Sequence, residues 1–500
     1  MEEKSNILKY KTLGIYTQNE NVVYMRKDCH VCISEGFEAL TRIRVSNMST
    51  SVIASLHIIT SDVLRQGEIG LSQIAAKKLK VSNGETLYVS HLEPIESLSF
   101  VRAKIYNQRL DYKAYKDIIT DIIEGDYSNI HLSAFITACA GDRMDLNEIS
   151  DLTKAMITSG KQLNWNKEIV VDKHCIGGLT GNRTTPIVVA IAAAYGLTMP
   201  KTSSRAITSP AGTADTMEVL TNVTLSGEEI KRVVEQEGGC LAWGGTAQLS
   251  PADDILIKVE KALDIDSEGQ LIASVLSKKA AAGATHVVID IPVGETAKVR
   301  SKEAAQKLKE HMEAVGDAVG LKIKVVITDG SQPVGRGIGP NLEAVDVLSV
   351  LQNEENAPQD LKERALLLAG ELLELSEKVE TGKGLETAKE LLESGKAYQK
   401  FEAICKAQGR FSKTYVAPYQ FEMHAPTSGT VKKINNRKIA KLAKLSGAPQ
   451  SKLAGISMNV RLGDEIEKGG LLYRLHAESN GELNYALEYY ENHDDIIVIE

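Results

Sequence analysis

The sequence lacks the features of a disulfide-stabilised, collagen-like or disordered chain. Its 500 residues include six cysteines and 12 prolines, and 43% of them are hydrophobic. Six cysteines scattered over so long a chain are too few for a disulfide scaffold, so a reduced, cytoplasmic protein is expected. Cys29 and Cys32 form a C-x-x-C pattern without a second pair at zinc-ribbon spacing. This pattern favours two structural cysteines in a strand over a metal or redox site, and no metal is expected.

An excess of positive charge and a long hydrophobic run are also absent. The chain has 58 Lys and Arg against 66 Asp and Glu, giving a net charge of −8. Without surplus cations, a protein built mainly to hold nucleic acid is not expected. The most apolar segment, 187–197, is about half as long as a membrane-spanning helix must be. The first residues show no basic stretch before an apolar core, so neither a signal peptide nor a membrane segment is expected.

The length and the changing hydrophobic pattern predict a multidomain α/β and α+β fold. Residues 1–92 contain short alternating segments, which predict an N-terminal β-rich, barrel-like module. Amphipathic patterns over 95–163 predict a helical domain, with a later contribution from about 250–280. One of its helices is expected at 112–124, with an apolar stripe made of Tyr115, Ile118, Ile119, Ile122 and Ile123. Strands and helices alternate over 164–412, with strands expected at 286–290 and 323–327, which predicts a central α/β domain with a mixed or parallel sheet. Residues 415–500 predict a C-terminal α+β module.

The strongest local signal is a glycine-rich loop between a predicted strand at 168–172 and a predicted helix at 185–195. It begins with Lys173 and contains the pair Gly177 and Gly178. Glycines let backbone N–H groups approach an oxyanion, the following helix adds its positive end, and lysine adds a charge. No Gly-Lys-Ser/Thr follows, so this is not a Walker A loop. The pattern favours an anion site over a tight connecting turn.

Two further segments carry polar side chains of the kind that bind small anions. Residues 203–215 combine serines and threonines with Arg205, which suits a phosphate or a base carbonyl. The alternative is that Thr213 caps the following helix and Arg205 pairs with a carboxylate. Ser274 and Lys278 are four residues apart, so they lie on one face of a predicted helix.

From about residue 95 to its end, the chain resembles the thymidine/pyrimidine-nucleoside phosphorylase family. Three motifs in the family's order carry the resemblance: Lys173-His174 with the glycine pair, the segment 203–218, and the segment 274–279. The N-terminal module resembles the extra domain of the family's longer branch, which includes archaeal AMP phosphorylases.

The resemblance implies a pentosyltransferase that performs reversible phosphorolysis. In nucleoside salvage or catabolism, thymidine and phosphate would give thymine and 2-deoxy-α-D-ribose 1-phosphate. An AMP-type nucleoside-monophosphate phosphorylase, which releases ribose 1,5-bisphosphate, is the alternative, and a non-catalytic nucleotide-binding protein is a third interpretation. Val259 stands where a base-binding arginine is expected, which favours the AMP type. The expected partners are a nucleoside or nucleotide and phosphate, with no cofactor besides this co-substrate, in a homodimer or larger homo-oligomer.

The resemblance also assigns roles to individual residues. His174 would be catalytic by polarising the departing base, and Asp266 would be the general acid of the AMP type. The phosphate would be lined by Lys173, Gly177, Gly178, Thr185, Ser203 and Thr213. The base and sugar would be contacted by Ser204, Arg205, Ala206, Ile207, Thr208, Ser209, Ser274, Lys278 and Lys298. Four residues depart from the pattern: Cys175 replaces a phosphate-binding serine, Thr180 is an extra residue in the glycine loop, Pro210 stands at a position that is usually Thr or Ala, and Val259 replaces the base-binding arginine.

Overall fold

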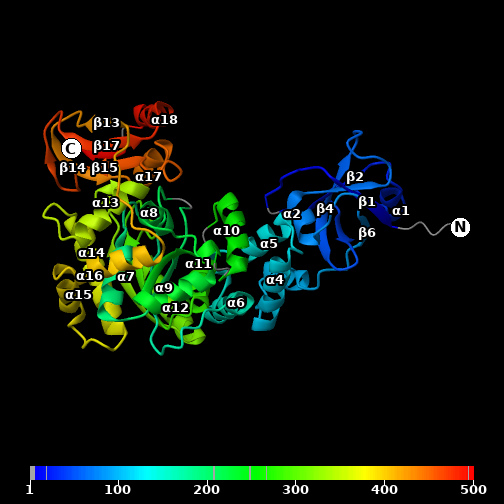
Figure 1. Ribbon diagram of the computed structural model, residues 1–500, viewed down its shortest axis with the longest axis horizontal. Coiled ribbons are helices and arrows are strands. Elements are labelled where there is room, and N and C mark those ends of the chain that lie inside the picture. Colours follow the sequence, from blue (N-terminus) through cyan, green and yellow to red (C-terminus); the bar gives the residue numbers. More distant parts are fainter. Residues whose placement is uncertain (1–5, 19, 207–208, 247–248, 266, 494) are drawn as a thin grey trace. The chain divides into compact units, whose positions relative to one another are not determined.

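The protein is described by a computed structural model over residues 6–18, 20–206, 209–246, 249–265, 267–493 and 495–500 (Figure 1). The chain divides into two compact units. The first unit comprises residues 1–143 and 252–267, and the second comprises 144–251 and 268–500. The two units do not correspond one to one to the four domains expected from the sequence. The four domains and their bounds therefore remain predictions.

The N-terminal part of the first unit is a closed six-stranded barrel. Its strands lie in the order β1–β5–β2–β4–β3–β6. Alternate side chains, such as Ile43 and Val45 of β3, are fully buried in the barrel core. The barrel agrees with the predicted barrel-like module, but Cys29 and Cys32 lie at the start of a helix and not in a strand. The elements are β1 (Ile7–Thr12), β2 (Val22–Arg26), α1 (His30–Glu35), β3 (Arg42–Ser46), β4 (Ser51–Ile59), β5 (Glu68–Leu71), α2 (Gln73–Leu79) and β6 (Thr86–His91).

Helices complete the first unit. The apolar stripe predicted from Tyr115 to Ile122 is buried on one face of α4, whose start is capped by the Asp111 carboxylate. Helix α10, which follows much later in the chain, belongs to the same unit. The elements are α3 (Leu98–Ile105), α4 (Tyr112–Glu124), α5 (Asn129–Cys139), the short 3₁₀ helix η1 (Gly141–Arg143) and α10 (Pro251–Leu263).

Parallel strands form the centre of the second unit, as the sequence predicts. Strands β11–β10–β7 form one parallel sheet and β8–β9 a parallel pair, and a single parallel bridge between Val170 and Thr198 joins them. The apolar faces of α7 and α14 are buried in the core around these strands. No helix within the described ranges is long and apolar enough to cross a membrane.

One prediction about this sheet is wrong. The strand expected at 168–172 is β7, and it runs from Val171 to Cys175. Lys173 and His174 therefore belong to a strand, where they pair with Val288 and Ile289 of β10, and not to the loop. The elements are α6 (Leu146–Ser159), β7 (Val171–Cys175), α7 (Thr184–Tyr195), β8 (Met199–Ser203), α8 (Thr213–Leu220), α9 (Gly227–Glu237), β9 (Gly239–Trp243), η2 (Gly244–Thr246), α11 (Glu268–Ala281), β10 (His286–Val293), α12 (Lys302–Val319), β11 (Lys322–Asp329), β12 (Gly337–Ile338), α13 (Pro340–Leu351), α14 (Gln359–Leu375), α15 (Gly384–Glu393) and α16 (Lys396–Ala407).

The C-terminal residues form an α+β module that belongs to the second unit. Its strand β15 pairs with β12, so the sheet β12–β15–β17–β13 includes a strand from the preceding α/β part. In Figure 1 this module, in orange and red, lies against α13. The elements are β13 (Tyr419–His424), β14 (Gly429–Ile434), α17 (Asn436–Leu445), β15 (Gly455–Met458), β16 (Glu465–Ile466), β17 (Leu471–Ala477), α18 (Asn480–Glu491) and β18 (Ile497–Ile499).

Candidate active site

The predicted ligand segments follow the carboxyl ends of three parallel strands. The glycine loop follows β7, the hydroxyl-rich segment follows β8, and the loop that carries Lys298 follows β10. Carboxyl ends of parallel strands meet at one edge of a sheet, where α/β proteins bind their ligands. Gly178 and Lys298 do meet there: a Cβ atom placed on Gly178 would lie 3.8 Å from the Cβ of Lys298.

Lys173 is a fully buried ammonium group at this edge. Its side chain has 0% exposure, and its Nζ donates a hydrogen bond to Thr184 Oγ1 at 2.8 Å. The same Nζ lies 4.0 Å from Asp290 Oδ2. A buried charge is tolerated only when it is paired and hydrogen-bonded, and Asp290 supplies the pairing. Lys173 thus places a positive charge at the first residue of α7.

His174 lies among lysines. The buried carboxylate of Asp172 contacts Lys201 at 3.1 Å and Lys279 at 2.9 Å. Burial by itself would raise the pKa of Asp172, but the two ammonium groups outweigh it and hold the pKa below its usual range. Burial, with the charges of Lys279, Lys201 and Lys278, lowers the pKa of His174 well below its ordinary value. The imidazole is therefore neutral at neutral pH.

Ser274 and Lys278 lie on one face of α11, as their spacing predicts. Lys278 Nζ donates a hydrogen bond to Ser274 Oγ at 3.1 Å, and both residues are partly exposed. Ser274 and Lys278 are therefore adjacent, and the charge of Lys278 contributes to lowering the pKa of His174.

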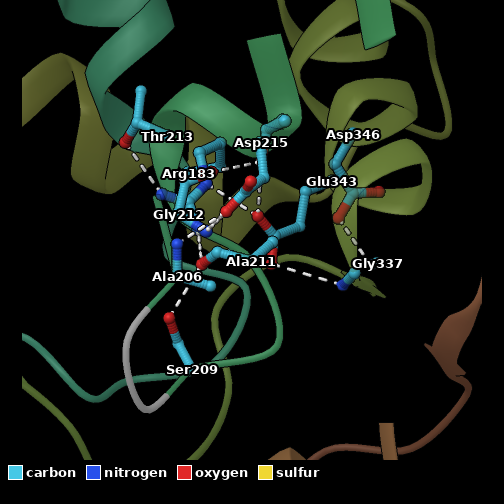
Figure 2. A network of polar contacts seen from close by, with 12 residues as sticks. Arg183, Ala206, Ser209, Ala211, Gly212, Thr213, Asp215, Gly337, Glu343 and Asp346 are labelled. Carbon is cyan, nitrogen blue, oxygen red and sulfur yellow. Dashed lines mark hydrogen bonds and ion pairs between the residues drawn. The ribbon is translucent and has the colours of Figure 1, made fainter. Parts of the chain in front are cut away.

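An arginine outside the predicted site residues connects the glycine loop to the hydroxyl-rich segment (Figure 2). Arg183, which immediately precedes α7, donates hydrogen bonds to Thr213 Oγ1 at 2.8 Å and to the Ala211 carbonyl at 2.9 Å. Its Nε donates to Glu343 Oε2 at 2.7 Å, and Glu343 is buried. No sequence pattern predicts how far such a side chain reaches, because its partners are 28 to 160 residues away.

The hydroxyl-rich segment is folded around Asp215. The Asp215 carboxylate accepts hydrogen bonds from the backbone N–H of Ala206 at 2.6 Å and of Gly212 at 3.0 Å (Figure 2). The N-cap of α8 is Gly212, and Thr213 is the first helical residue. The expectation that Thr213 caps α8 is therefore wrong, because its hydroxyl is bonded to Arg183 instead.

Arg205 pairs with carboxylates, as one of the two interpretations of the sequence expects. It binds Glu218 through two nitrogens at 2.8 and 2.6 Å and Asp215 at 3.2 Å. Its guanidinium carbon also lies 4.9 Å from the centre of the Trp243 ring. The hydrogen bond from Arg205, with a further contribution from Lys452, lowers the pKa of Glu218 to about 2.

The remaining predicted residues occupy varied positions. The Ser203 hydroxyl is buried and has no hydrogen-bond partner among the residues that the structure describes. Ser209 Oγ donates to the Ala211 carbonyl at 2.8 Å. Thr185 is buried as the second residue of α7, while Ser204 is exposed. Ile207, Thr208 and Asp266 lie outside the described residues.

Comparison with known families and proteins shows which proteins the chain is related to. Residues 98–160 match the model of the glycosyl transferase family helical bundle domain, 167–398 its a/b domain, and 430–496 the pyrimidine nucleoside phosphorylase C-terminal domain. A Legionella pneumophila (strain Corby) protein named "Putative thymidine phosphorylase" is 55% identical over 492 residues, which cover 98% of this chain and 95% of that protein. The chain belongs to the thymidine/pyrimidine nucleoside phosphorylase family. A protein of the same name from Hahella chejuensis is 52% identical over 499 residues, or 100% of this chain and 99% of that protein.

Solved structures share the fold at lower sequence identity. Anthranilate phosphoribosyltransferase from Thermus thermophilus has a TM-score of 0.53 and 20% identity, covering 62% of this chain and 98% of that one. The Saccharomyces cerevisiae enzyme, solved with PRPP and Mg, has a TM-score of 0.51 and 16% identity, covering 64% and 99%. The family models and relatives together make the chain a pentosyltransferase.

Proposed function

We propose that the protein catalyses the phosphorolysis of thymidine, giving thymine and 2-deoxy-α-D-ribose 1-phosphate, in nucleoside salvage or catabolism. The observation that carries this proposal is the buried Ser203 hydroxyl at the end of β8, which has no partner in the described part of the chain. Such a group is costly unless a ligand or water binds it, and phosphate oxygens accept hydrogen bonds from hydroxyls. Membership of the family supplies the reaction class.

Lys173, Gly177, Gly178, Thr185, Ser203 and Thr213 would bind the phosphate. Helix α7 begins without a side-chain cap, so its first N–H groups can donate to an anion. Lys173 supplies the positive charge at α7, and Arg183 joins the start of α7 to that of α8 through Thr213.

In the proposed reaction, a phosphate oxygen forms a bond to the anomeric carbon as the bond from that carbon to the base nitrogen breaks. The electron pair of the broken bond goes to the base, which takes up a proton in exchange for the one that the phosphate gives up. An oxocarbenium-like centre is stabilised by the neighbouring anionic phosphate. A neutral His174 can donate an N–H to a base carbonyl, while Ser274 and Lys278 stabilise the negative charge on the leaving base. Arg205, held by Glu218, would order the hydroxyl-rich segment 203–215.

An AMP-type phosphorylase is the second candidate. It requires a second phosphate pocket, which Lys298 and the segment 204–209 would provide. The close approach of Gly178 to Lys298 favours this candidate, because it places a second ammonium-bearing residue beside the glycine loop. Asp266 would then protonate the departing base.

A substrate panel tests both candidates. The purified protein is incubated with phosphate and thymidine, uridine, AMP or CMP, and free base and sugar phosphate are measured. We expect thymine and 2-deoxyribose 1-phosphate from thymidine, with no product when phosphate is omitted. Base release only from the monophosphates would contradict the thymidine assignment in favour of the AMP type. Base release from none would contradict both.

A further inference from the structure

We propose that the C-terminal module positions the phosphate site, because its residues Asn436 and Lys452 fix the two segments that would hold the anion. Both are positioning residues: they act through the loops and not by touching the phosphate. This inference rests on the proposed function, since it assumes that phosphate binds at these loops.

Asn436 joins three loops through one buried amide. Its side chain is 0% exposed and belongs to the first residue of α17. Asn436 Oδ1 accepts a hydrogen bond from Thr180 Oγ1 at 3.2 Å, and Nδ2 donates to Thr296 Oγ1 at 3.0 Å and to the Gly330 carbonyl at 3.2 Å. These partners follow β7, β10 and β11 respectively. A single side chain of the C-terminal module therefore connects the carboxyl ends of three neighbouring parallel strands.

The contact with Thr180 explains how the extra residue of the glycine loop is accommodated. The backbone of Thr180 accepts a hydrogen bond from Val334 N at 3.1 Å while its hydroxyl is bonded to Asn436. The next residue, Gly181, has φ +79°, and a Cβ atom there would lie 1.9 Å from the Val334 carbonyl oxygen. The end of the loop is thus fixed from two sides, which sets the positions of the N–H groups ahead of it.

Lys452 acts on the hydroxyl-rich segment 203–215 through its charge. Its Nζ lies 2.8 Å from Glu218 Oε2 and 3.8 Å from Asp215 Oδ1. Arg205 binds the same two carboxylates, so two cations balance two anions. Without Lys452, one negative charge would remain uncompensated beside a segment expected to bind an anion, and the site would repel phosphate.

The module is attached to the α/β part independently of these two residues. Strand β15 pairs with β12, and Arg461 donates to the carbonyls of Pro333 and Gly335. Substitution of Asn436 or Lys452 therefore leaves the shared sheet and the Arg461 contacts in place, which makes the inference testable in the full-length protein.

The test compares Asn436→Ala, Thr180→Val and Lys452→Met with the control Asn459→Ala. Asn459 lies in the same module, is exposed, and donates from its side chain to the Leu471 carbonyl at 3.0 Å, within the module itself. We expect the KM for phosphate to rise about tenfold in the three variants, while kcat and the KM for the nucleoside change little. The rise in Tm caused by inorganic phosphate should shrink in the same variants and persist in Asn459→Ala.

Two outcomes would overturn the inference: an unchanged phosphate KM and phosphate-induced Tm shift in Asn436→Ala and Thr180→Val, or equal losses in Asn459→Ala. Thr180→Val keeps the shape of the side chain, so it tests the contact even if Asn436→Ala does not fold. A phosphate-induced Tm shift that depends on Asn436, in a protein that releases no base from any substrate, would support this inference and contradict the proposed function. Turnover with a phosphate KM that Asn436→Ala leaves unchanged would support the proposed function and contradict this inference.

Discussion

Among single residues, Lys173 allows the most specific prediction, because its ammonium group is fully buried and lies 4.0 Å from Asp290. Lys173→Met should lower kcat/KM for phosphate at least about a hundredfold, since a charge-assisted contact is lost and Asp290 stays buried without its cation. Steady-state kinetics at varied phosphate concentration measure the effect. Lys231→Met, on the exposed face of α9, is the matched control. Equal phosphate kinetics in wild type and Lys173→Met would show that Lys173 does not serve the anion.

The neutral state of His174 gives a prediction about pH. Burial and neighbouring lysines depress the pKa of His174 in the folded protein below the unfolded value of about 6.5. As the pH falls through that unfolded value, only the unfolded chain takes up the proton, so the contribution of His174 to folding becomes unfavourable at acid pH. We expect the wild-type kcat to show no loss between pH 8 and about pH 6.5 from protonation of this residue.

Variants of His174 separate its N–H group from its charge. His174→Asn retains a donor and should keep more activity than His174→Ala, which should release base about a hundredfold more slowly. Both are measured as kcat against pH with saturating phosphate. An acid limb near pH 6.5 in the wild type that disappears in His174→Asn would contradict a neutral imidazole.

Among helices and strands, the sequence predicted the elements whose residues repeat with a clear period. Helix α4 and the strands β10 and β11 were expected from their apolar patterns, and the structure confirms them and their parallel pairing. The sequence predicted that the strand ends at residue 172 and that Lys173 and His174 lie in the following loop, because the polar run Asp172-Lys173-His174 is not typical of a strand. The run nevertheless pairs with β10, and its buried charges are balanced by ion pairs of Asp172 with Lys201 and Lys279 and of Lys173 with Asp290. Such pairings depend on contacts between distant residues, which periodicity cannot reveal.

Glu343 of α13 connects α7 to α8, because it accepts hydrogen bonds from Arg183 and from Thr216 Oγ1, and the sequence did not predict this contact either. The side chains of Arg183 and Glu343 are 13% and 1% exposed. Arg183→Met should reduce the free energy of unfolding by about 3 kcal/mol, because a buried carboxylate would lose its cation. Urea unfolding monitored by tryptophan fluorescence measures this loss. The double variant Arg183→Met/Glu343→Gln should be more stable than Arg183→Met alone, and a double variant that is equally or less stable would contradict a charge effect.

For the whole molecule, the division into two units has a thermodynamic consequence. Every described residue of the predicted phosphate site lies in the second unit, whereas the barrel and α10 belong to the first. The core of the barrel is separate from that of the α/β part. Proteins with separate cores commonly unfold in more than one transition, and a ligand stabilises the part to which it binds.

Calorimetry of the full-length protein should therefore show two unfolding transitions, of which phosphate raises only one. At about a hundred times its Kd, phosphate should add about 2.7 kcal/mol to the unit that binds it. Leu56→Ala assigns the transitions, because Leu56 is fully buried in the barrel and its truncation should lower the first unit's transition by a few kcal/mol, on the order of 2 to 5. Phosphate should raise the transition that Leu56→Ala leaves unchanged. If phosphate instead raised the transition that Leu56→Ala lowers, the anion would bind outside the second unit, and the loops after β7 and β8 would not be its site.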